Sequence, residues 1–225
     1  GSAYHQKSAM KIERIGGAIL LSGWLVASAN AQFYFMTNAN NTLTVAYYFG
    51  PGGDVEIPAE IEGRTVANIA VSAFHSNTNI VNIRIPSSVT NIEWTAFYGC
   101  TSLTNVSILG TIGHIGRSTF SGCFRLMSFT IPPGVAYVGE AAFNRCSNLT
   151  SLMIGASVTN IGPGAFAYCT SLTNIVIPDS VRKIDSSAFE NCRGLASVTI
   201  GNGTTSIGGS AFSPCTNLSS LVIGN

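Results

Sequence analysis

Six cysteines are the first residues of this chain whose type and spacing suggest chemistry. They return every 23 residues, at Cys100, Cys123, Cys146, Cys169, Cys192 and Cys215. In an extracellular protein, six cysteines ordinarily predict three disulfides. Equivalent positions on neighbouring turns of a repeat, however, lie about 4.8 Å apart with parallel side chains, a poor geometry for a disulfide or for tetrahedral zinc. We therefore expect a structural column of buried free thiols that pack as small hydrophobic side chains, with disulfide pairing as the alternative.

Histidines and carboxylates form no catalytic pattern in the sequence. His75 and His114 occupy different positions of the 23-residue unit, and their spacing suggests no carboxylate or cysteine partner. Glu93 and Asp185 share a position but lie four repeats apart, which is roughly 19 Å at about 4.8 Å per turn. Hydrolysis by paired carboxylates needs about 5–9.5 Å. We therefore predict a protein that is not an enzyme and that holds no cofactor or metal; a glycan-active enzyme is the alternative, and it lacks its carboxylate pair.

Phenylalanine recurs with the same period as cysteine and indicates the architecture. It stands at Phe74, Phe97, Phe120, Phe143, Phe166, Phe189 and Phe212, and a fixed period of about 20–50 residues is the signature of a solenoid. Within each unit, a stretch such as Leu103–Ile108 predicts a short strand with one buried face. Ala96–Cys100 fits one helical turn or a tight loop. Proline ends the strand in three units, at Pro86, Pro132 and Pro178. One unit cannot bury its apolar side alone, so the units must stack.

The repeated unit resembles that of a known family. It reads C-x-x-L-x-x-V-x-I-P-x-x-V-x-x-I-G-x-x-A-F-x-x, and residues 169–189 follow it almost position by position. This is similar to the 23-residue leucine-rich repeat of the bacterial surface protein A-like (BspA-like) family, also called the treponemal type, over about 66–225. The resemblance implies a repeat solenoid: a right-handed superhelix with short parallel strands on its concave face, short helical turns or loops on its convex face, and an N-terminal β cap. Departures are small, such as Thr119 for alanine and Asn77 for the cysteine, where an asparagine must satisfy backbone groups.

The start of the chain predicts export. A basic segment at 10–14 precedes an apolar run at 15–27, and Ala29-Asn30-Ala31 supplies a small-x-small cleavage site; together these are typical of a signal peptide. We expect four segments: residues 1–9 added ahead of the native start, 10–31 as the signal peptide, 32–65 as an N-terminal β capping unit and 66–225 as the leucine-rich repeat domain of about seven repeats. An uncleaved anchor is the alternative; after signal cleavage we expect no membrane span.

Charge limits the classes of partner. Only 9% of the residues are charged, and 32–225 carry eight Lys/Arg against nine Asp/Glu, a balance near −1. Binding to nucleic acid requires a basic stripe, and an anionic membrane surface likewise attracts basic residues. The sequence therefore predicts neither as a partner.

Outward-facing strand positions form the predicted binding site. Two neighbouring columns contribute Asn82, Arg84, Asn105, Ser107, Ser128, Thr130, Ser151, Met153, Asn174, Val176, Ser197 and Thr199. On the concave face they would form a nearly uncharged strip able to hydrogen-bond a glycan or an extended peptide; soluble, strand-tolerant filler is the alternative. Trp94, Tyr98 and Tyr168 are expected on the opposite surface, where aromatic side chains can anchor an interface.

These observations predict an exported binding module, secreted or at the cell surface. The family resemblance implies adhesion or protein–protein interaction, with a protein or glycan as the partner. The alternative is a structural component of a surface layer or matrix. Such a protein would self-associate through its C-terminal edge, where Leu218–Asn225 completes a strand without a polar cap.

Overall fold

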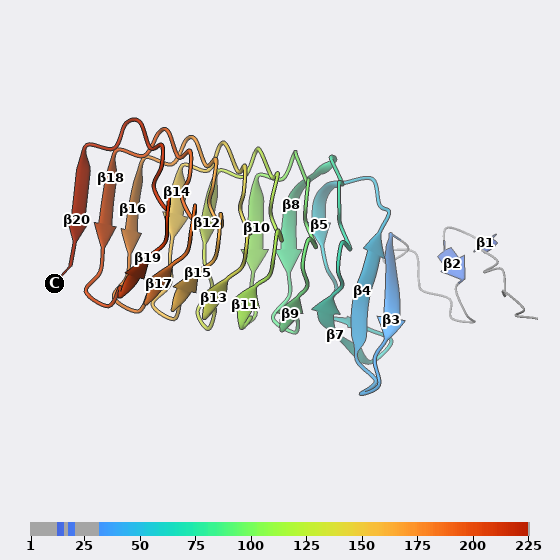
Figure 1. Ribbon diagram of the computed structural model, residues 1–225. Coiled ribbons are helices and arrows are strands. Elements are labelled where there is room, and N and C mark those ends of the chain that lie inside the picture. The colour runs from blue at the N-terminus through green and yellow to red at the C-terminus, as the bar shows by residue number, and fades with distance from the viewer. Residues whose placement is uncertain (1–12, 16–17, 21–31, 225) are drawn as a thin grey trace, which may run out of the picture.

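The computed structural model describes residues 13–15, 18–20 and 32–224, and residues 32–224 form a β-solenoid of about eight turns (Figure 1). Residues 1–9, expected to be an addition ahead of the native start, lie outside the described residues, and so does most of the expected signal peptide at 10–31. Within that segment the structure describes an antiparallel pair of short strands, β1 (Glu13–Ile15) and β2 (Ala18–Leu20). Among the residues described, we find no helix capable of crossing a bilayer.

One side of the solenoid, here called the long-strand face, receives one strand from each turn. Its strands are β5 (Gly53–Glu56), β8 (Ile80–Ile85), β10 (Asn105–Ile108), β12 (Ser128–Thr130), β14 (Ser151–Met153), β16 (Asn174–Ile177), β18 (Ser197–Ile200) and β20 (Ser220–Ile223). Neighbouring strands that pair do so in parallel, and equivalent residues of the repeat face one another, as Asn105 faces Asn82. Each column of the sequence repeat therefore becomes a straight row of side chains along the molecule.

The long-strand face is divided into three sheets, β5-β8-β10, β12-β14 and β16-β18-β20. Each break precedes a strand that is followed by proline. Where the ladder is intact, Leu109 donates its N–H to the carbonyl oxygen of Ile85 at 3.0 Å. Pro132 and Pro178 occupy the position of Leu109 in the turns that follow the breaks, and proline has no N–H to donate. The prolines therefore end their strands and also remove a bond to the preceding turn.

The opposite side, the short-strand face, is more continuous. It contains β7 (Arg64–Ile69), β9 (Asn91–Ile92), β11 (His114–Ile115), β13 (Tyr137–Val138), β15 (Asn160–Ile161), β17 (Lys183–Ile184) and β19 (Ser206–Ile207). The strands from β11 to β19 form one parallel sheet, whereas β9 pairs with β7. Most of these strands are two residues long because a tight turn follows each one.

The third side consists of tight turns, so of the two expected alternatives, helical turns or loops, the structure has the loops. Each segment that bears a phenylalanine from Phe74 to Phe189 contains two residues with left-handed backbone, four positions apart, such as Thr95 (φ 53°) and Gly99 (φ 70°). Left-handed residues interrupt a right-handed helix, and no helix occurs in residues 32–224. The turns bond along the solenoid as strands do, because Phe97 donates its N–H to Thr119 O at 2.9 Å. The other phenylalanines from Phe74 to Phe189 make the equivalent bond.

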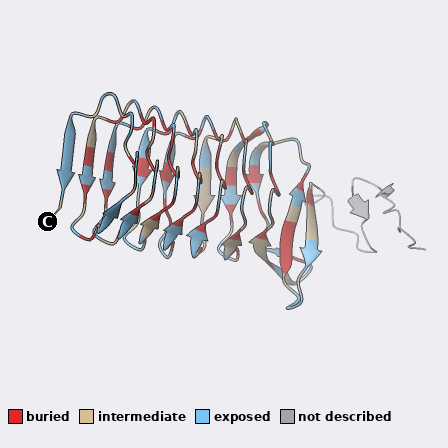
Figure 2. Ribbon diagram, viewed as in Figure 1, coloured by how far each residue is buried: buried red, intermediate tan, exposed pale blue. Residues whose placement is uncertain are grey.

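The core is a column of stacked phenylalanine rings that runs the length of the repeats. Ring centroids of successive members from Phe74 to Phe212 lie 4.8–5.3 Å apart. The members from Phe74 to Phe189 are fully buried, and Figure 2 shows buried residues lining the inside of every central turn. Because each ring contacts the next, burial of one turn depends on the presence of its neighbours.

An N-terminal hairpin extends this core with aromatic rings that lie outside the repeats. Strands β3 (Phe33–Thr37) and β4 (Leu43–Tyr48) pair antiparallel, and β4 then runs parallel to β7. The short β6 (Glu60–Ile61) pairs antiparallel with β7. The Tyr48 ring stacks on Phe74 with centroids 5.3 Å apart, and Phe33 packs on Tyr48 at 5.1 Å. Residues 32–65, for which β structure was expected, thus contain this pair of strands.

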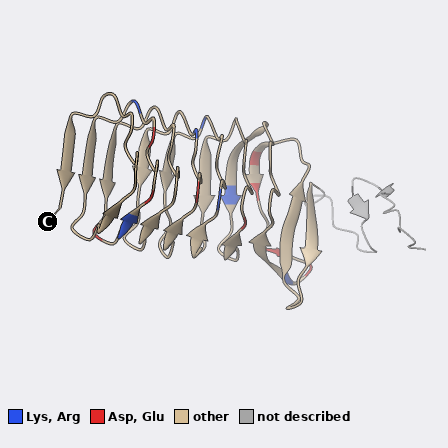
Figure 3. Cartoon of the chain, in the orientation of Figure 1, with Lys and Arg blue, Asp and Glu red and all other residues tan. Residues whose placement is uncertain are grey.

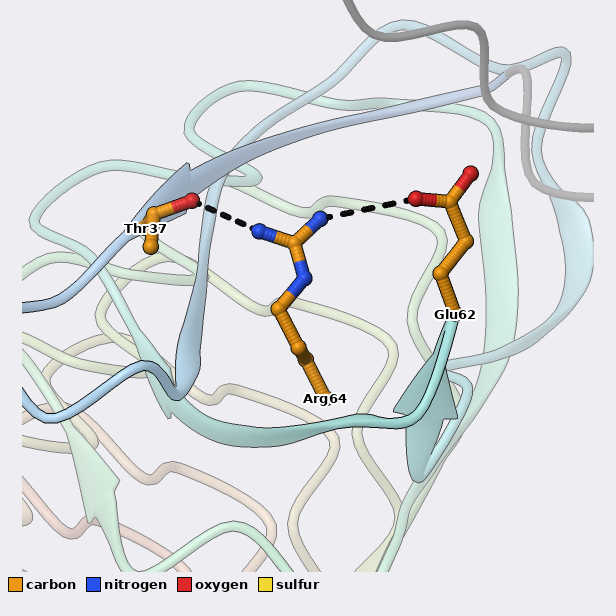
Figure 4. Close-up of polar contacts among 3 residues, drawn as sticks. All are labelled: Thr37, Glu62 and Arg64. Atoms are coloured by element: carbon orange, nitrogen blue, oxygen red, sulfur yellow. Dashed lines mark hydrogen bonds and ion pairs between the residues drawn. The ribbon is translucent and has the colours of Figure 1, made fainter.

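An arginine joins the hairpin to the first turn. The Nη1 of Arg64, at the start of β7, donates to Thr37 Oγ1 at the end of β3, at 2.9 Å. Its Nη2 lies 3.6 Å from Glu62 Oε2, as Figure 4 shows. Since the guanidinium bridges two segments, it fixes the free end of β3 against the solenoid.

Candidate functional site

All twelve residues of the predicted strip lie in strands of the long-strand face. Asn82, Ser107 and Ser197 are partly exposed, and the other nine are exposed: Arg84, Asn105, Ser128, Thr130, Ser151, Met153, Asn174, Val176 and Thr199. Parallel register places equivalent members side by side. Two of the exposed members are apolar, Met153 at 63% and Val176 at 65%, so the strip changes from polar to mixed character toward its middle.

Hydrogen bonds link some of these side chains across neighbouring strands. Asn82 donates through Nδ2 to Asp54 Oδ1 at 2.6 Å. Further along, Ser197 donates through its hydroxyl to Asn174 Oδ1 at 2.8 Å. Such bonds hold the side chains in fixed orientations, which lowers the conformational cost of binding a ligand across them.

Charge on the long-strand face is concentrated at its N-terminal end (Figure 3). Arg84 Nε lies 3.3 Å from Glu56 Oε1, and both side chains are largely exposed. Together with Asp54 and Asn105 they line a shallow hollow of about 420 Å³. The sequence columns missed Asp54 and Glu56 because β5 precedes the first regular repeat.

A second hollow, of about 430 Å³, marks the break between β10 and β12. Its walls include Asn105, Ser107, Ser128 and Thr130, and Phe129, Pro132 and Pro133 form an apolar margin. Phe129 takes a position that holds Val, Ile or Leu in the other strands, and its ring packs 4.7 Å from that of Phe143. The larger ring and the missing proline N–H together explain the opening. The Pro-Pro pair was its only signal in the sequence.

The cysteine column consists of free thiols that are hydrogen-bonded. Each Sγ donates to the carbonyl oxygen of the phenylalanine in the preceding turn, at 3.1–3.4 Å; Cys146, for example, donates to Phe120 O. Five are buried and Cys215 is partly exposed. Burial raises the pKa of Cys146 well above its usual value, helped by the neighbouring thiols, and raises that of Cys192 to about 12. These protonated thiols are poor nucleophiles.

In the first turn Asn77 occupies the position of the cysteine and makes different hydrogen bonds. Its Oδ1 accepts from the backbone N–H groups of Asn79 at 3.1 Å and Ile80 at 3.2 Å. The expected role of this asparagine, satisfying backbone groups, is thus observed. Elsewhere in residues 32–224, no three His, Cys, Asp or Glu side chains gather closely enough to hold a metal ion.

Exposed aromatic side chains lie on the turns. Trp94, Tyr98 and Tyr168 are all exposed, as expected. Tyr98 stacks on His75, with ring centroids 5.0 Å apart and planes 10° apart, and the Arg145 guanidinium lies 5.2 Å from the centroid of Tyr168. Sequence reasoning missed both partners, although each stands 23 residues before its ring in the same column of the repeat, so the period was the signal that could have found them.

The chain was compared with known families and structures. The family model for the BspA type leucine rich repeat region matches six copies, over residues 55–173 and 159–225. Among curated proteins, no significant match was found.

Solved structures with a similar fold come from several bacteria. The leucine rich repeat protein of T. pallidum (TpLRR) is 30% identical, with a TM-score of 0.76 over 84% of this chain and 88% of that one. A leucine rich cell surface protein of Faecalibacterium prausnitzii is 24% identical, with a TM-score of 0.53 over 86% and 75% of the two chains. The pneumococcal vaccine antigen PcpA is 17% identical, with a TM-score of 0.57 over 96% and 71%. The last two show similarity of fold alone.

The family match spans most of the solenoid, and its period is that of the phenylalanine and cysteine columns. The match to TpLRR extends the similarity to most of both chains. This chain belongs to the BspA-type leucine-rich repeat family.

Proposed function

We propose that this protein is an exported, non-enzymatic binding module, secreted or at the cell surface, that acts in adhesion or protein–protein interaction. Its binding surface is the long-strand face. The observation that carries the proposal is the straight row of mostly uncharged amide and hydroxyl side chains, of which Ser197 is hydrogen-bonded to Asn174 and Asn82 to Asp54. Such a row suits contact with an extended partner across several strands at once.

Two further points support this proposal. The family is a leucine-rich repeat family, a fold that presents extended surfaces, and the F. prausnitzii neighbour is described as a cell surface protein. The hairpin β3–β4 is proposed as an N-terminal cap, because it covers the first turn with Tyr48 and Phe33 and pairs with β7. A cap of this kind shields the apolar end and the strand edge of a solenoid.

A binding screen tests the proposal. The full chain is applied to immobilised extracellular-matrix proteins and glycans beside a variant carrying Asn105→Arg and Asn174→Arg on the long-strand face. A second variant with Ala136→Arg and Ser206→Arg, both exposed on the short-strand side, is the matched control. Saturable binding lost only in the first variant is the expected result. Binding retained by the first variant and lost by the control would assign the activity to the other face.

The alternative function is structural, with copies stacking through β20. This strand pairs with β18, and Leu221, Val222 and Ile223 are each about half exposed, as Figure 2 also shows for the whole strand. If copies stack, the molar mass measured by light scattering rises with concentration and Leu221→Lys abolishes the rise. A constant monomer mass would eliminate this alternative.

A further inference from the structure

The N-terminal turns carry a group of exposed aromatic side chains. Trp94 is 58% exposed and Tyr47 is 54% exposed, and Phe49, Val71 and Tyr98 are also exposed. Exposed apolar groups of this size are uncommon at one location on a soluble surface, and such patches mark binding sites. The turns beyond residue 116 hold smaller or charged residues at the position of Trp94, namely Arg117, Glu140, Pro163, Ser186 and Gly209.

Backbone hydrogen bonds place these side chains on successive turns. Ala70 donates its N–H to Val45 O and Tyr48 donates to Ala73 O, both at 2.9 Å, so residues 45–48 run alongside 70–73. Tyr47 therefore lies beside Val71. Ser72 in turn donates to Trp94 O at 3.3 Å. Since Trp94 follows Val71 by 23 residues, Tyr47, Val71 and Trp94 come from three neighbouring turns.

Stacking holds the surrounding rings in a fixed plane. Tyr47 and Phe49 stack with centroids 6.4 Å apart and planes 25° apart. His75 and Tyr98 stack at 5.0 Å and 10°. Rings held in this way lose little freedom when a ligand lies against them, which favours binding.

A hollow of about 760 Å³ adjoins this aromatic group. Val71 lines it, and so do Ala46 and Glu93, the residues that directly precede Tyr47 and Trp94. Its volume falls in the range of about 300–1,000 Å³ typical of small-ligand sites. Tyr47 and Trp94 are not part of this lining, but Val71, which lies between them on the middle of the three turns, is, so we infer that the two rings border the hollow at this side.

The polar lining of the hollow is rich in amides and already ordered. Asn68 donates to Thr44 Oγ1 at 3.3 Å, and Thr44 donates to Asn38 Oδ1 at 2.9 Å. On the next turn, Asn91 donates to Glu93 Oε1 at 2.7 Å. Each asparagine amide has both donor and acceptor capacity, of which these bonds use only a part. The lining thus offers several oriented donors and acceptors and a single carboxylate.

This combination selects a class of ligand. Flat rings bind the C–H face of a sugar ring, because the face of an aromatic ring carries negative charge and C–H groups carry slight positive charge. Amides and a carboxylate match vicinal hydroxyls, which both donate and accept. A nucleic acid would require a basic surface, whereas the only charged side chain in the lining is Glu93.

We propose that the hollow bounded by Met36, Asn68, Asn91 and Glu93 is a saccharide-binding site, with Tyr47 and Trp94 as its stacking platform and an oligosaccharide without negative charge as its ligand. The site is separate from the long-strand face and does not depend on the function proposed for that face. A protein that packs on the aromatic group is the competing occupant, and the test distinguishes the two.

The test uses an array of short neutral oligosaccharides of glucose, galactose, mannose and N-acetylglucosamine, with the full chain as the analyte. Retained sugars are then titrated against the wild type, Trp94→Ala and Asn91→Ala. Both substitutions should weaken the binding at least about tenfold, since each removes a stacking or hydrogen-bonding group worth about 1.4 kcal/mol or more. Far-UV circular dichroism and a thermal melt confirm that each variant is folded.

Two controls make the outcome specific. Tyr168→Ala removes an exposed ring from a distant turn, and Ser206→Arg adds a charge at an exposed, distant position of the short-strand face; both should leave affinity within about twofold of the wild type. Asn174→Arg is titrated beside them to test the long-strand face. The proposal is overturned if no oligosaccharide is retained, or if Trp94→Ala binds as the wild type does. If Asn174→Arg is the only variant that loses affinity, sugar binding is assigned to the long-strand face. If no sugar is retained, but a protein ligand binds the wild type and does not bind Trp94→Ala, the site is assigned to a protein partner.

Discussion

The repeated turns and the N-terminal turns use aromatic side chains in opposite ways. In the repeats, one ring per turn is buried in a continuous stack from Phe74 to Phe189. At the N-terminal end, Tyr47, Phe49 and Trp94 are exposed, and a hollow with an amide-rich lining lies beside their neighbour Val71. The difference shows that inward positions, whose residue type recurs with the period, belong to the core. Outward positions, whose residue type varies from turn to turn, are available for recognition.

The largest expected effect comes from interrupting the buried stack. Phe143→Ala leaves a cavity between Phe120 and Phe166, and removal of a buried Phe side chain typically costs about 3–5 kcal/mol. Trp94→Ala, which removes a larger but exposed ring, should change the unfolding free energy by less than about 0.5 kcal/mol. Urea unfolding followed by circular dichroism measures both. Equal losses in the two variants would contradict the distinction between buried and exposed rings.

Backbone contact between repeats gives the next largest effect. A Cβ added at Gly139 would lie 2.7 Å from Gly116 C and 2.8 Å from Arg117 N, whereas one added at Gly113 would meet nothing within 4 Å. Gly139→Ala should therefore cost about 1–3 kcal/mol, as overpacking does. Gly113→Ala should stay within about 0.5 kcal/mol. Thermal melts of the two variants check this prediction. If Gly139→Ala left the stability unchanged, the turns could separate without a free-energy cost.

The thiol column predicts a loss of stability in alkali. Burial raises the pKa of Cys146 above its usual value of 9.0, so the folded chain keeps a proton that the unfolded chain releases above about pH 9. Stability is then fully present below pH 9 and falls as pH rises, by up to about 1.4 kcal/mol per pH unit for each such thiol. Urea unfolding at several pH values from 8 to alkaline conditions measures the slope. Cys146→Ala should show a shallower slope, and an unchanged slope would refute the assignment.

The smallest effect on stability is expected at the exposed ring of Tyr47. Tyr47→Ala removes a stack with Phe49 but little buried area, so the unfolding free energy should change by less than about 0.5–1 kcal/mol. The same urea titration applies. A loss of several kcal/mol would mean that Tyr47 is part of the core of the N-terminal hairpin, which would weaken its role in recognition.

The repeated part of the fold was predictable because each inward column recurs in the sequence. The phenylalanine period, the strand at Leu103–Ile108 and the family all follow from residue types and spacing. The sequence could not decide between helical turns and loops, because the choice depends on backbone angles: Ser118, Ala141 and Tyr168 adopt positive φ, and these residue types do not signal it. The breaks in the long-strand face could not be predicted from the sequence. Predicting them requires knowing which hydrogen bond to the preceding turn is lost where proline has no N–H to donate.

The candidate sites were less predictable than the fold. Columns located the outward strip, since parallel register brings equivalent residues together. The N-terminal hollow combines Asn38, Asn68 and Asn91 from segments with different spacing, so no periodic pattern could indicate it. Only the pairing of β4 with β7 brings Tyr47 next to Val71.

The direction of the hydrogen bonds has a mechanical consequence. Strand ladders and the phenylalanine N–H bonds all connect one turn to the next, so they lie along the length of the solenoid. A pull on its two ends therefore loads the interfaces between turns in series, so each carries the full tension and the weakest separates first. Under axial tension the molecule would extend stepwise at low force. A sideways load, shared by many turns at once, would meet much greater resistance.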